Sequence, residues 1–296
     1  MDTKVNNLRG ENHPKAQSHT LRYPTALSIA GSDSSAGAGI QADLKTFSAL
    51  GVYGATAITA ITAQNTEGVV SQCALPADIV RDQIVAVIED IRPSVIKIGM
   101  LHNRDTANIV ADTLERYNIP IILDPVMVST SGHRLLSPDA EDVITKRLLP
   151  MAMLITPNIP EMAALTAMPL TTLDEKRAAA CSLLRRGAKA ILLKGGHEEG
   201  NTKIDILYQA TEKGMRISYF ASPTIATRNT HGTGCTLSAA IASYIALGYE
   251  FEDAVAKAKS FISSAIEAGQ WVTIGKGHGP VNHMFNPQPL TAYEEL

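Results

Sequence analysis

The sequence predicts an α/β fold with a mostly parallel central sheet. From Ala26 onward, short apolar runs alternate with longer amphipathic runs, which is the pattern of strands and helices in such a fold. Polar or reactive residues follow nearly every apolar run, at the edge where open parallel sheets bind their ligands. The composition, 45% hydrophobic and 19% charged residues over 296 positions, is ordinary for a globular protein and provides a substantial core.

The first half of the chain is expected to contain apolar strands separated by amphipathic helices. The strands lie at residues 26–30, 52–63, 95–98 and 120–123. Between the first two, Ile40, Leu44 and Phe47 recur at helical spacing and predict a helix that Gly51 closes. A polar segment up to residue 74 follows the second strand. Two more helices are expected, at residues 76–91 and around residues 109–117.

The second half continues the alternation and adds an edge hairpin. Ser137 followed by Pro138 is the pattern of a helix start, and Thr172 with Glu175 has the spacing of a capping box. A turn at residues 212–214 predicts an antiparallel hairpin at the edge of the sheet. The remaining expected elements are strands at 153–155, 190–193, 204–208 and 215–220, and helices at 173–186, 237–247 and 253–269.

One domain is predicted over residues 25–285, with a disordered extension at 1–24 and a tail at 286–296. The extension is polar and lacks the apolar region of a signal peptide. No apolar run approaches the ~20 residues that a membrane helix needs. The net charge of −3 gives no basic surface for nucleic acid or an anionic membrane, so small-molecule partners are favoured.

Cysteine usage indicates a reducing compartment. Cys73, Cys181 and Cys235 are scattered and have no CxxC spacing, so neither a disulfide framework nor a structural zinc site is indicated. The histidines show no metal-ligand spacing. A cytoplasmic location is therefore expected.

The most informative stretch is Asn-Thr-His-Gly-Thr-Gly-Cys-Thr at residues 229–236. It precedes a run of small and apolar residues at helical spacing, with Gly248 as the expected C-cap. Glycines allow the backbone to approach a ligand, and the first turn of a helix presents N–H groups without intrahelical partners. The sequence therefore predicts an anion site here, with an ordinary helix cap as the alternative.

A second glycine motif, Gly-Ala-Gly-Ile-Gln-Ala at residues 37–42, fits the dinucleotide fingerprint but is rejected. A dinucleotide site needs an Asp or Glu at the end of the second strand, about 20 residues on, to bind a ribose. The strand at 52–63 contains no acidic residue.

Taken together, eight blocks closely resemble the hydroxymethylpyrimidine and phosphomethylpyrimidine kinases of thiamin biosynthesis, in the ribokinase-like superfamily. The resemblance implies a three-layer α/β/α sandwich with a mostly parallel sheet, a homodimer, and ATP-dependent phosphorylation of 4-amino-5-hydroxymethyl-2-methylpyrimidine and then of its monophosphate. One departure is the loop at 33–37, where many relatives read Asp-Pro-Ser-Gly-Gly and this chain has Asp-Ser-Ser-Ala-Gly. The blocks lie at residues 31–33, 36–46, 61–66, 97–101, 124–126, 156–161, 194–197 and 231–236.

The resemblance assigns roles to residues at the phosphoryl-transfer end. Gly232, Thr233 and Gly234 match the anion hole, whose backbone N–H groups stabilise the charge of the phosphoryl group in transfer. Cys235 stands where most ribokinase-like kinases have an aspartate base, and the helix start is expected to ionise its thiol in part. A small buried packing residue is the alternative. Lys194 resembles the lysine that binds nucleotide phosphate, with a strand-end lysine reaching solvent as the alternative.

The resemblance also assigns the substrate pocket. Gln64 would read the pyrimidine, since its amide offers an acceptor and two donors for a ring nitrogen and an exocyclic amine. Gly31, Thr62 and Met100 match other pocket positions. Asp43 does as well, with a helix first-turn acid as its alternative.

Asp124, Asn158 and Glu161 match positions that arrange Mg²⁺ and its water around the ATP phosphates. Oxygen ligands at strand ends suit such a cation, and Asp124 and Glu161 are expected to act largely through water. Capping of the helix that begins at Pro160 is the alternative for the last two. ATP and Mg²⁺ are thus the expected cofactors, with a monovalent cation as a further candidate. His197 and His231 are expected to shape loops.

The sequence leaves two other functions open. A pyridoxine or pyridoxal kinase is the nearest rival, because some relatives with this sequence plan phosphorylate those rings. A catalytically silent sensor that binds pyrimidine is the rival from another class. It would show a broken anion hole or a lost lysine, and this chain has both features intact.

Overall fold

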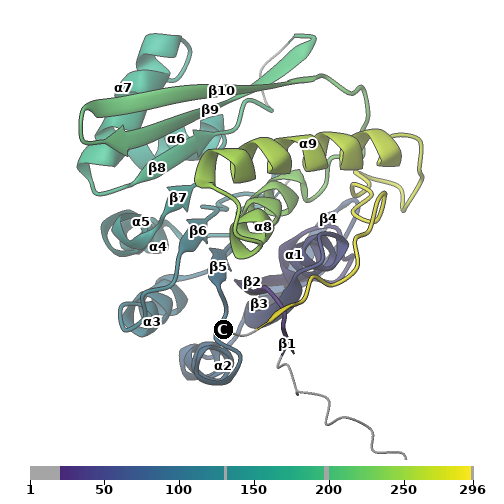
Figure 1. Ribbon diagram of the computed structural model, residues 1–296. Helices are drawn as coiled ribbons and strands as arrows, with labels where there is room; N and C mark the ends of the chain where they lie inside the picture. The colour runs from purple at the N-terminus through teal and green to yellow at the C-terminus, as the bar shows by residue number, and fades with distance from the viewer. Residues whose placement is uncertain (1–20, 130–131, 197–199, 295–296) are drawn as a thin grey trace, which may run out of the picture.

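The computed structural model describes residues 21–129, 132–196 and 200–294. These residues form a three-layer α/β/α sandwich, in which helices cover both faces of one large sheet (Figure 1). The fold class expected from the sequence is therefore confirmed. His197 and residues 1–20 of the expected extension lie outside the described residues.

The described part of the chain forms a central sheet of nine strands. They are β2 (Thr25–Asp33), β3 (Tyr53–Asn65), β4 (Gly68–Ala74), β5 (Val95–Ile98), β6 (Ile121–Leu123), β7 (Leu154–Ile155), β8 (Ala190–Leu193), β9 (Thr202–Thr211) and β10 (Gly214–Pro223). The spatial order is β10-β9-β8-β7-β6-β5-β2-β3-β4. From β3 to β8 all neighbours are parallel, and the strands at both edges are antiparallel. The central strands are covered on both faces, which explains their continuous apolar runs.

The helices divide into two layers, each with its own apolar core. One face carries α1 (Gly39–Ala49), α8 (Thr233–Ala246) and α9 (Phe251–Gly269), which pack around residues such as Phe47, Ile241 and Phe261. The other face packs around residues such as Ile84, Val110 and Leu183. Its helices are α2 (Ala77–Asp90), α3 (Arg104–Leu114), α4 (Pro138–Val143), α5 (Leu149–Met151), α6 (Ile159–Thr166) and α7 (Leu173–Arg185), with the π-turn η1 (Ile144–Leu148) joining α4 to α5.

Several local predictions are confirmed. Strands β9 and β10 form the expected edge hairpin, with Gly214 at a φ of +124° beside the turn. The side chains of Thr172 and Glu175 form the expected capping box at the start of α7. Gly248 follows α8 with a φ of +83°, as a C-cap glycine should.

Two local features differ from the prediction. The polar segment before residue 74 contains β4, which pairs antiparallel with β3. None of its residues is fully buried, and its sequence lacks the apolar alternation that marks a half-buried strand. Ser137 does precede α4, but its hydroxyl donates to Asp139 and does not cap the backbone.

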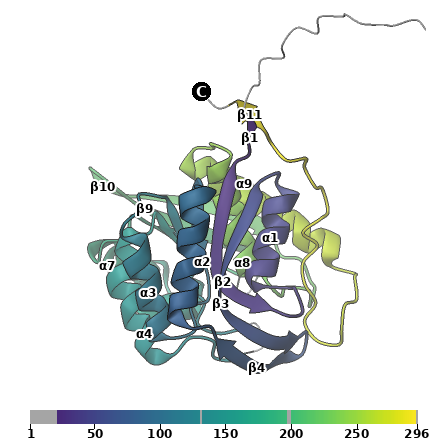
Figure 2. The ribbon, with the colours of Figure 1, turned by 90° about the horizontal axis from the view of Figure 1, so that it is seen from below.

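The two ends of the described chain meet. Leu21–Arg22 (β1) pairs antiparallel with Tyr293–Glu294 (β11), and Figure 2 shows this pair beyond the main sheet. The described residues therefore include a strand before residue 25 and a strand after residue 285. No helix in the described ranges combines the length and apolar character needed to cross a bilayer.

Candidate active site

The predicted site residues gather at the carboxyl edge of the parallel strands, as such sheets require. Asp124 directly follows β6, and Lys194 directly follows β8. Helix α8 starts with Thr233 at the same edge, since a Cβ on Gly234 would lie 3.3 Å from Lys194 Nζ and 3.7 Å from Asp124 Oδ2. Three segments that are far apart in the sequence thus lie next to one another at this edge of the sheet.

Gly232 has a structural reason to be glycine. It is the N-cap of α8 with a φ of +79°, a conformation that residues with a Cβ rarely adopt. An added Cβ would lie 1.8 Å from the carbonyl oxygen of Gly37. The loop at residues 33–38 therefore packs directly on the start of α8.

Lys194 lies between two acidic side chains. Its Nζ is 2.8 Å from Asp124 Oδ1 and 3.7 Å from Glu161 Oε2. Burial lowers the pKa of Lys194, but the charges of Asp124 and Glu161 outweigh this and raise it, so the ammonium is charged. Its side chain is 13% exposed, which leaves it accessible to an anion at the start of α8.

Asp124 is held from several sides. Thr156 Oγ1 donates to its Oδ1 at 3.0 Å, and Ser238 Oγ, from α8, donates to its Oδ2 at 3.4 Å. Burial raises the pKa of Asp124, but the ammonium groups of Lys194 and Lys97 lower it below its ordinary value. The carboxylate is therefore ionised and fixed in place.

Asn158 and Glu161 form the capping box of α6. Asn158 Oδ1 accepts from the Glu161 N–H, and Glu161 Oε2 accepts from the Asn158 N–H, both at 2.8 Å. The alternative role considered for this pair is thus present in the structure. Burial raises the pKa of Glu161 despite the opposing charge of Lys194.

The described residues contain no cluster of three or more His, Cys, Asp and Glu side chains that could enclose a metal ion. The oxygen ligands of Asp124 and Glu161 nevertheless suit Mg²⁺, which keeps several of its waters. Because Lys194 contacts both carboxylates, these residues fit a hydrated ion better than a direct cage.

Cys235 lies in the first turn of α8 with a partly exposed side chain. Burial of the thiol raises its pKa to about 11, although Lys97 and the backbone N–H of Gly39 act in the opposite direction. The expectation that the helix start ionises this thiol in part is therefore wrong for the free protein. The desolvation of the thiol outweighs the favourable charges around it.

A buried ion pair lies behind the site. Lys97 Nζ, from β5, is 2.9 Å from Asp43 Oδ2 on α1, and neither side chain is exposed. Ser28 Oγ donates to the same Asp43 oxygen at 2.6 Å. The first turn of α1 contains no acidic residue, so Asp43 is not a first-turn acid. Its side chain is also fully buried, so it does not form an exposed wall of the pocket. Burial raises its pKa despite the charge of Lys97.

The predicted pyrimidine pocket lies at the ends of β2, β3 and β5. A Cβ on Gly31 would be 2.3 Å from Met100 Cε, so the glycine makes room for that side chain. Met100 is buried against Ala60, and Thr62 is buried on β3. Gln64, two residues further along β3, is half-buried.

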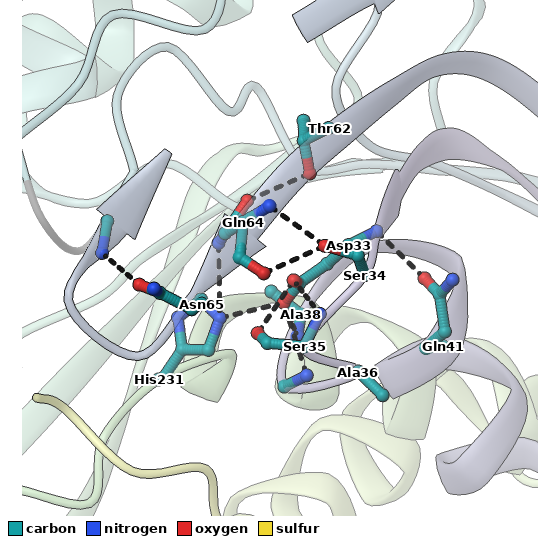
Figure 3. Close-up of polar contacts among 12 residues, drawn as sticks. Asp33, Ser34, Ser35, Ala36, Ala38, Gln41, Thr62, Gln64, Asn65 and His231 are labelled. Carbon is teal, nitrogen blue, oxygen red and sulfur yellow. Dashed lines mark hydrogen bonds and ion pairs between the residues drawn. The ribbon is translucent and has the colours of Figure 1, made fainter. Parts of the chain in front are cut away.

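The loop at residues 33–38 is organised around the Asp33 carboxylate (Figure 3). Its Oδ1 accepts from the N–H and hydroxyl of Ser35, and its Oδ2 accepts from the N–H groups of Gly37 and Ala38. His231 Nε2 lies 2.8 Å from the same Oδ2. Ala36 takes a φ of +61°, in the left-handed region that favours glycine.

Ser34 connects this loop to the pocket (Figure 3). Its hydroxyl donates to the carbonyl oxygen of Gln64 at 2.7 Å and accepts from the N–H of Gln64 at 2.8 Å. Ser34 thus holds the backbone of Gln64.

Sequence reasoning missed three contributors: Lys97, Ser34 and Asp205. Asp205 accepts from the Gly195 N–H and pairs with Lys259 at 2.8 Å, which fixes the loop after Lys194. A lysine inside the apolar run Val-Ile-Lys-Ile was a usable signal for Lys97, since a buried charge requires a partner. The other two depend on contacts that spacing does not reveal.

Comparisons relate the chain to known kinases. A family model described as phosphomethylpyrimidine kinase matches residues 33–282. A hydroxymethylpyrimidine/phosphomethylpyrimidine kinase of Rhizobium meliloti is 49% identical over 260 residues, which cover 87% of this chain and 96% of that protein. A crystal structure of phosphomethylpyrimidine kinase from Clostridium difficile matches with 44% identity and a TM-score of 0.71, over 82% of this chain and 99% of that one. An ADP complex of Bacillus subtilis pyridoxal kinase matches with 35% identity and a TM-score of 0.79, over 88% and 96%.

Proposed function

The chain belongs to the phosphomethylpyrimidine kinase family, and from that premise we propose that this cleft performs both phosphorylations of the aminopyrimidine alcohol. The enzyme is a hydroxymethylpyrimidine and phosphomethylpyrimidine kinase of thiamin biosynthesis. The observation that carries the site assignment is the contact between Lys194, Asp124 and the start of α8.

The pocket at the ends of β2, β3 and β5 would bind the pyrimidine. Gln64 would pair with the ring nitrogen and the exocyclic amine, and Met100 would cover the ring. Support comes from the half-buried position of Gln64 and the packing of Met100 against Gly31. Asp43 would act from behind the pocket wall through its contact with Lys97.

The start of α8 would bind the phosphoryl group in transfer. The N–H groups of Gly234 and Cys235 belong to a helix first turn, whose donors have no intrahelical partner. The N–H of Thr233, one of the predicted anion-hole donors, instead donates to the carbonyl oxygen of Thr230 at 3.2 Å. Lys194 would neutralise charge on the transferred group, with Asp124 and Glu161 holding its ammonium in place. Positioning and charge stabilisation are the main contributions a protein makes to this reaction.

Cys235 would accept the proton of the attacking hydroxyl. The base would be the thiolate form, which becomes the neutral thiol when it takes the proton. Because burial raises the pKa of Cys235 to about 11, this thiolate is the minor form in the free protein. The Lys97 ammonium would stabilise the thiolate before the transfer, since its charge lowers this pKa.

ATP is the phosphoryl donor that the kinase family implies. Mg²⁺ would be held by Asp124 and Glu161 through water, with Asn158 positioning Glu161, and when bound it would neutralise phosphate charge. A homodimer, a cytoplasmic location and a monovalent cation stay predictions.

One assay tests this function. Purified protein with Mg-ATP is offered the aminopyrimidine alcohol, its monophosphate, pyridoxine and pyridoxal in separate reactions. We expect the pyrimidine diphosphate to form from the first two. Phosphorylation of pyridoxine or pyridoxal alone would contradict the proposal and favour the pyridoxal kinase alternative. Binding of pyrimidine without any product would favour the silent sensor.

A further inference from the structure

The side-chain amide of Gln64 lies between Thr62 and His231 (Figure 3). Its Oε1 is 3.1 Å from Thr62 Oγ1, and its Nε2 is 3.3 Å from His231 Nε2. The oxygen and the NH₂ group of a side-chain amide have nearly the same shape, but the oxygen accepts hydrogen bonds and the NH₂ group donates them. The positions of the protons on Thr62 and His231 therefore decide which of them faces the oxygen of Gln64 and which faces its nitrogen.

Thr62 favours the amide nitrogen as its neighbour. Its hydroxyl has one proton, and Oγ1 also lies 2.9 Å from the carbonyl oxygen of Ser32. With Oε1 of Gln64 toward Thr62, the single hydroxyl proton faces two acceptors, and the lone pairs of Oγ1 receive no donor from Gln64. With the amide nitrogen there instead, Thr62 donates to Ser32 and accepts from Gln64.

His231 favours the amide oxygen as its neighbour. Burial raises the pKa of Asp33, but hydrogen bonds from His231, Ser35 and Ala38 lower it to about 2, so Asp33 is ionised. Nε2 of His231, at 2.8 Å from Asp33 Oδ2, must then carry a proton. The Nε2–H of His231 is a donor, so it conflicts with the amide nitrogen of Gln64, which also donates, and it suits the acceptor Oε1.

We propose that His231 is a positioning residue whose Nε2–H, shared between Asp33 and Oε1 of Gln64, fixes the Gln64 amide with its nitrogen toward Thr62. This inference rests on the proposed function, in which that amide reads the aminopyrimidine. After the two contacts the amide retains one N–H and one lone pair, the functions that an exocyclic amine and a ring nitrogen require. Reversal of the amide would exchange donor and acceptor and misalign the ring.

The surroundings hold this arrangement tightly. A Cβ on Gly37 would lie 2.2 Å from Cδ2 of His231, so the ring packs directly against the glycine, where no other residue would fit without a shift. Ser34 fixes the backbone of Gln64 through two hydrogen bonds. His231 directly precedes Gly232, so one residue connects the orientation of the pyrimidine to the anion hole.

The first test is His231→Phe, which keeps an aromatic ring and removes the donor. We expect KM for the aminopyrimidine alcohol to rise about tenfold, the effect of one hydrogen bond, and KM for ATP to change less than about twofold. His278→Phe is the matched control, because that exposed ring is in a neighbouring loop and bonds to Arg228. A similar rise in the control would contradict the assignment.

The second test asks whether His231 acts through Gln64. In a Gln64→Ala background, His231→Phe is expected to raise KM for the pyrimidine less than about twofold further, because the group it orients is gone. If His231→Phe raises KM equally with and without Gln64, His231 only packs the loop and the proposal is overturned.

The third test needs no substrate. Long-range ¹H–¹⁵N spectra of the histidine rings should show a proton on Nε2 of His231, and the Gln64 side-chain amide resonances should shift in His231→Phe but not in His278→Phe. An unprotonated Nε2 would overturn the inference. A wild-type protein that shows these signals but does not phosphorylate the pyrimidine would contradict the proposed function alone.

Discussion

At the start of α8 the side chains are fixed by the sheet and by buried charge, whereas at the end of β3 they are held by loop hydrogen bonds. Lys194 and Asp124 each follow a buried parallel strand and contact each other at 2.8 Å. Gln64 is held instead by Ser34, an exposed loop residue, and by His231. The groups that we propose to face developing charge are thus anchored rigidly, while the groups that we propose to recognise the substrate lie where a few contacts set their orientation. Substitutions at the start of α8 should therefore reduce kcat, and substitutions at the end of β3 should mainly raise KM for the pyrimidine.

The largest expected effect is at Lys194. Lys194→Met removes the charge that we propose to face the phosphoryl group, and it takes the nearest ammonium away from Asp124 and Glu161. We expect kcat to fall by about 10³-fold, at the upper end of the effect of removing one electrostatic donor. Steady-state kinetics checks this, with Lys189→Met as the control, since that exposed residue precedes the same strand at the opposite edge. A kcat within fivefold of the wild type would mean that the phosphate lies elsewhere.

A smaller loss is expected for Gly234→Ala. The added methyl would lie 3.3 Å from Lys194 Nζ and so intrude on the phosphate end without colliding with the backbone. We expect the fold to persist and kcat to fall about 10²-fold. Gly196→Ala is the control, because a Cβ there meets nothing within 4 Å. If the two variants had the same kcat, the first turn of α8 would not form the anion hole.

The pH dependence sharpens the role of Cys235. Because burial raises its pKa to about 11, the thiolate is a minor species at neutral pH and its share rises tenfold per pH unit below that value. If the thiolate is the base, kcat/KM should rise with pH from 6 to 9, and Cys235→Ala should lose roughly 10²-fold in activity together with this slope. An alanine variant with the same activity and the same slope would assign Cys235 to packing.

The smallest expected effect concerns the loop between the two ends. Ala36 has a φ of +61°, where glycine carries no steric penalty. Ala36→Gly is expected to raise the free energy of unfolding by about 0.5–1 kcal/mol and to change KM less than twofold. Ala38→Gly, at a φ of −133°, should instead lower it by a similar amount. Denaturant unfolding measures both, and a loss of stability in Ala36→Gly would show that the loop is unstrained.

The elements that the sequence predicts well are those with local signals. The Thr172 and Glu175 capping box, the edge hairpin and the helix after Gly234 follow from residues close together in the chain. Strand β4 was missed because none of its residues is fully buried and its sequence does not alternate apolar with polar residues. The local sequence pattern therefore predicts an element well when one of its faces is buried, and it does not predict a strand that has no buried face.

The site was predictable in its members and less so in their environment. Apolar runs ending in Asp124 and Lys194 place those residues at one edge, since parallel strands share it. The partners of Asp43 and Gln64 could not be predicted, because Lys97 lies 54 residues from Asp43 and Ser34 lies 30 residues from Gln64. The state of Cys235 was predicted wrongly because desolvation depends on what the folded chain packs around the thiol.

The most direct test is a crystal structure of the protein with a non-hydrolysable ATP analogue and the aminopyrimidine alcohol. The γ-phosphate is expected within hydrogen-bond distance of the N–H groups of Gly234 and Cys235 and of Lys194 Nζ, with the hydroxymethyl oxygen beside it and the ring paired to Gln64. A γ-phosphate bound away from the start of α8, or a ring that does not contact Gln64, would contradict the account.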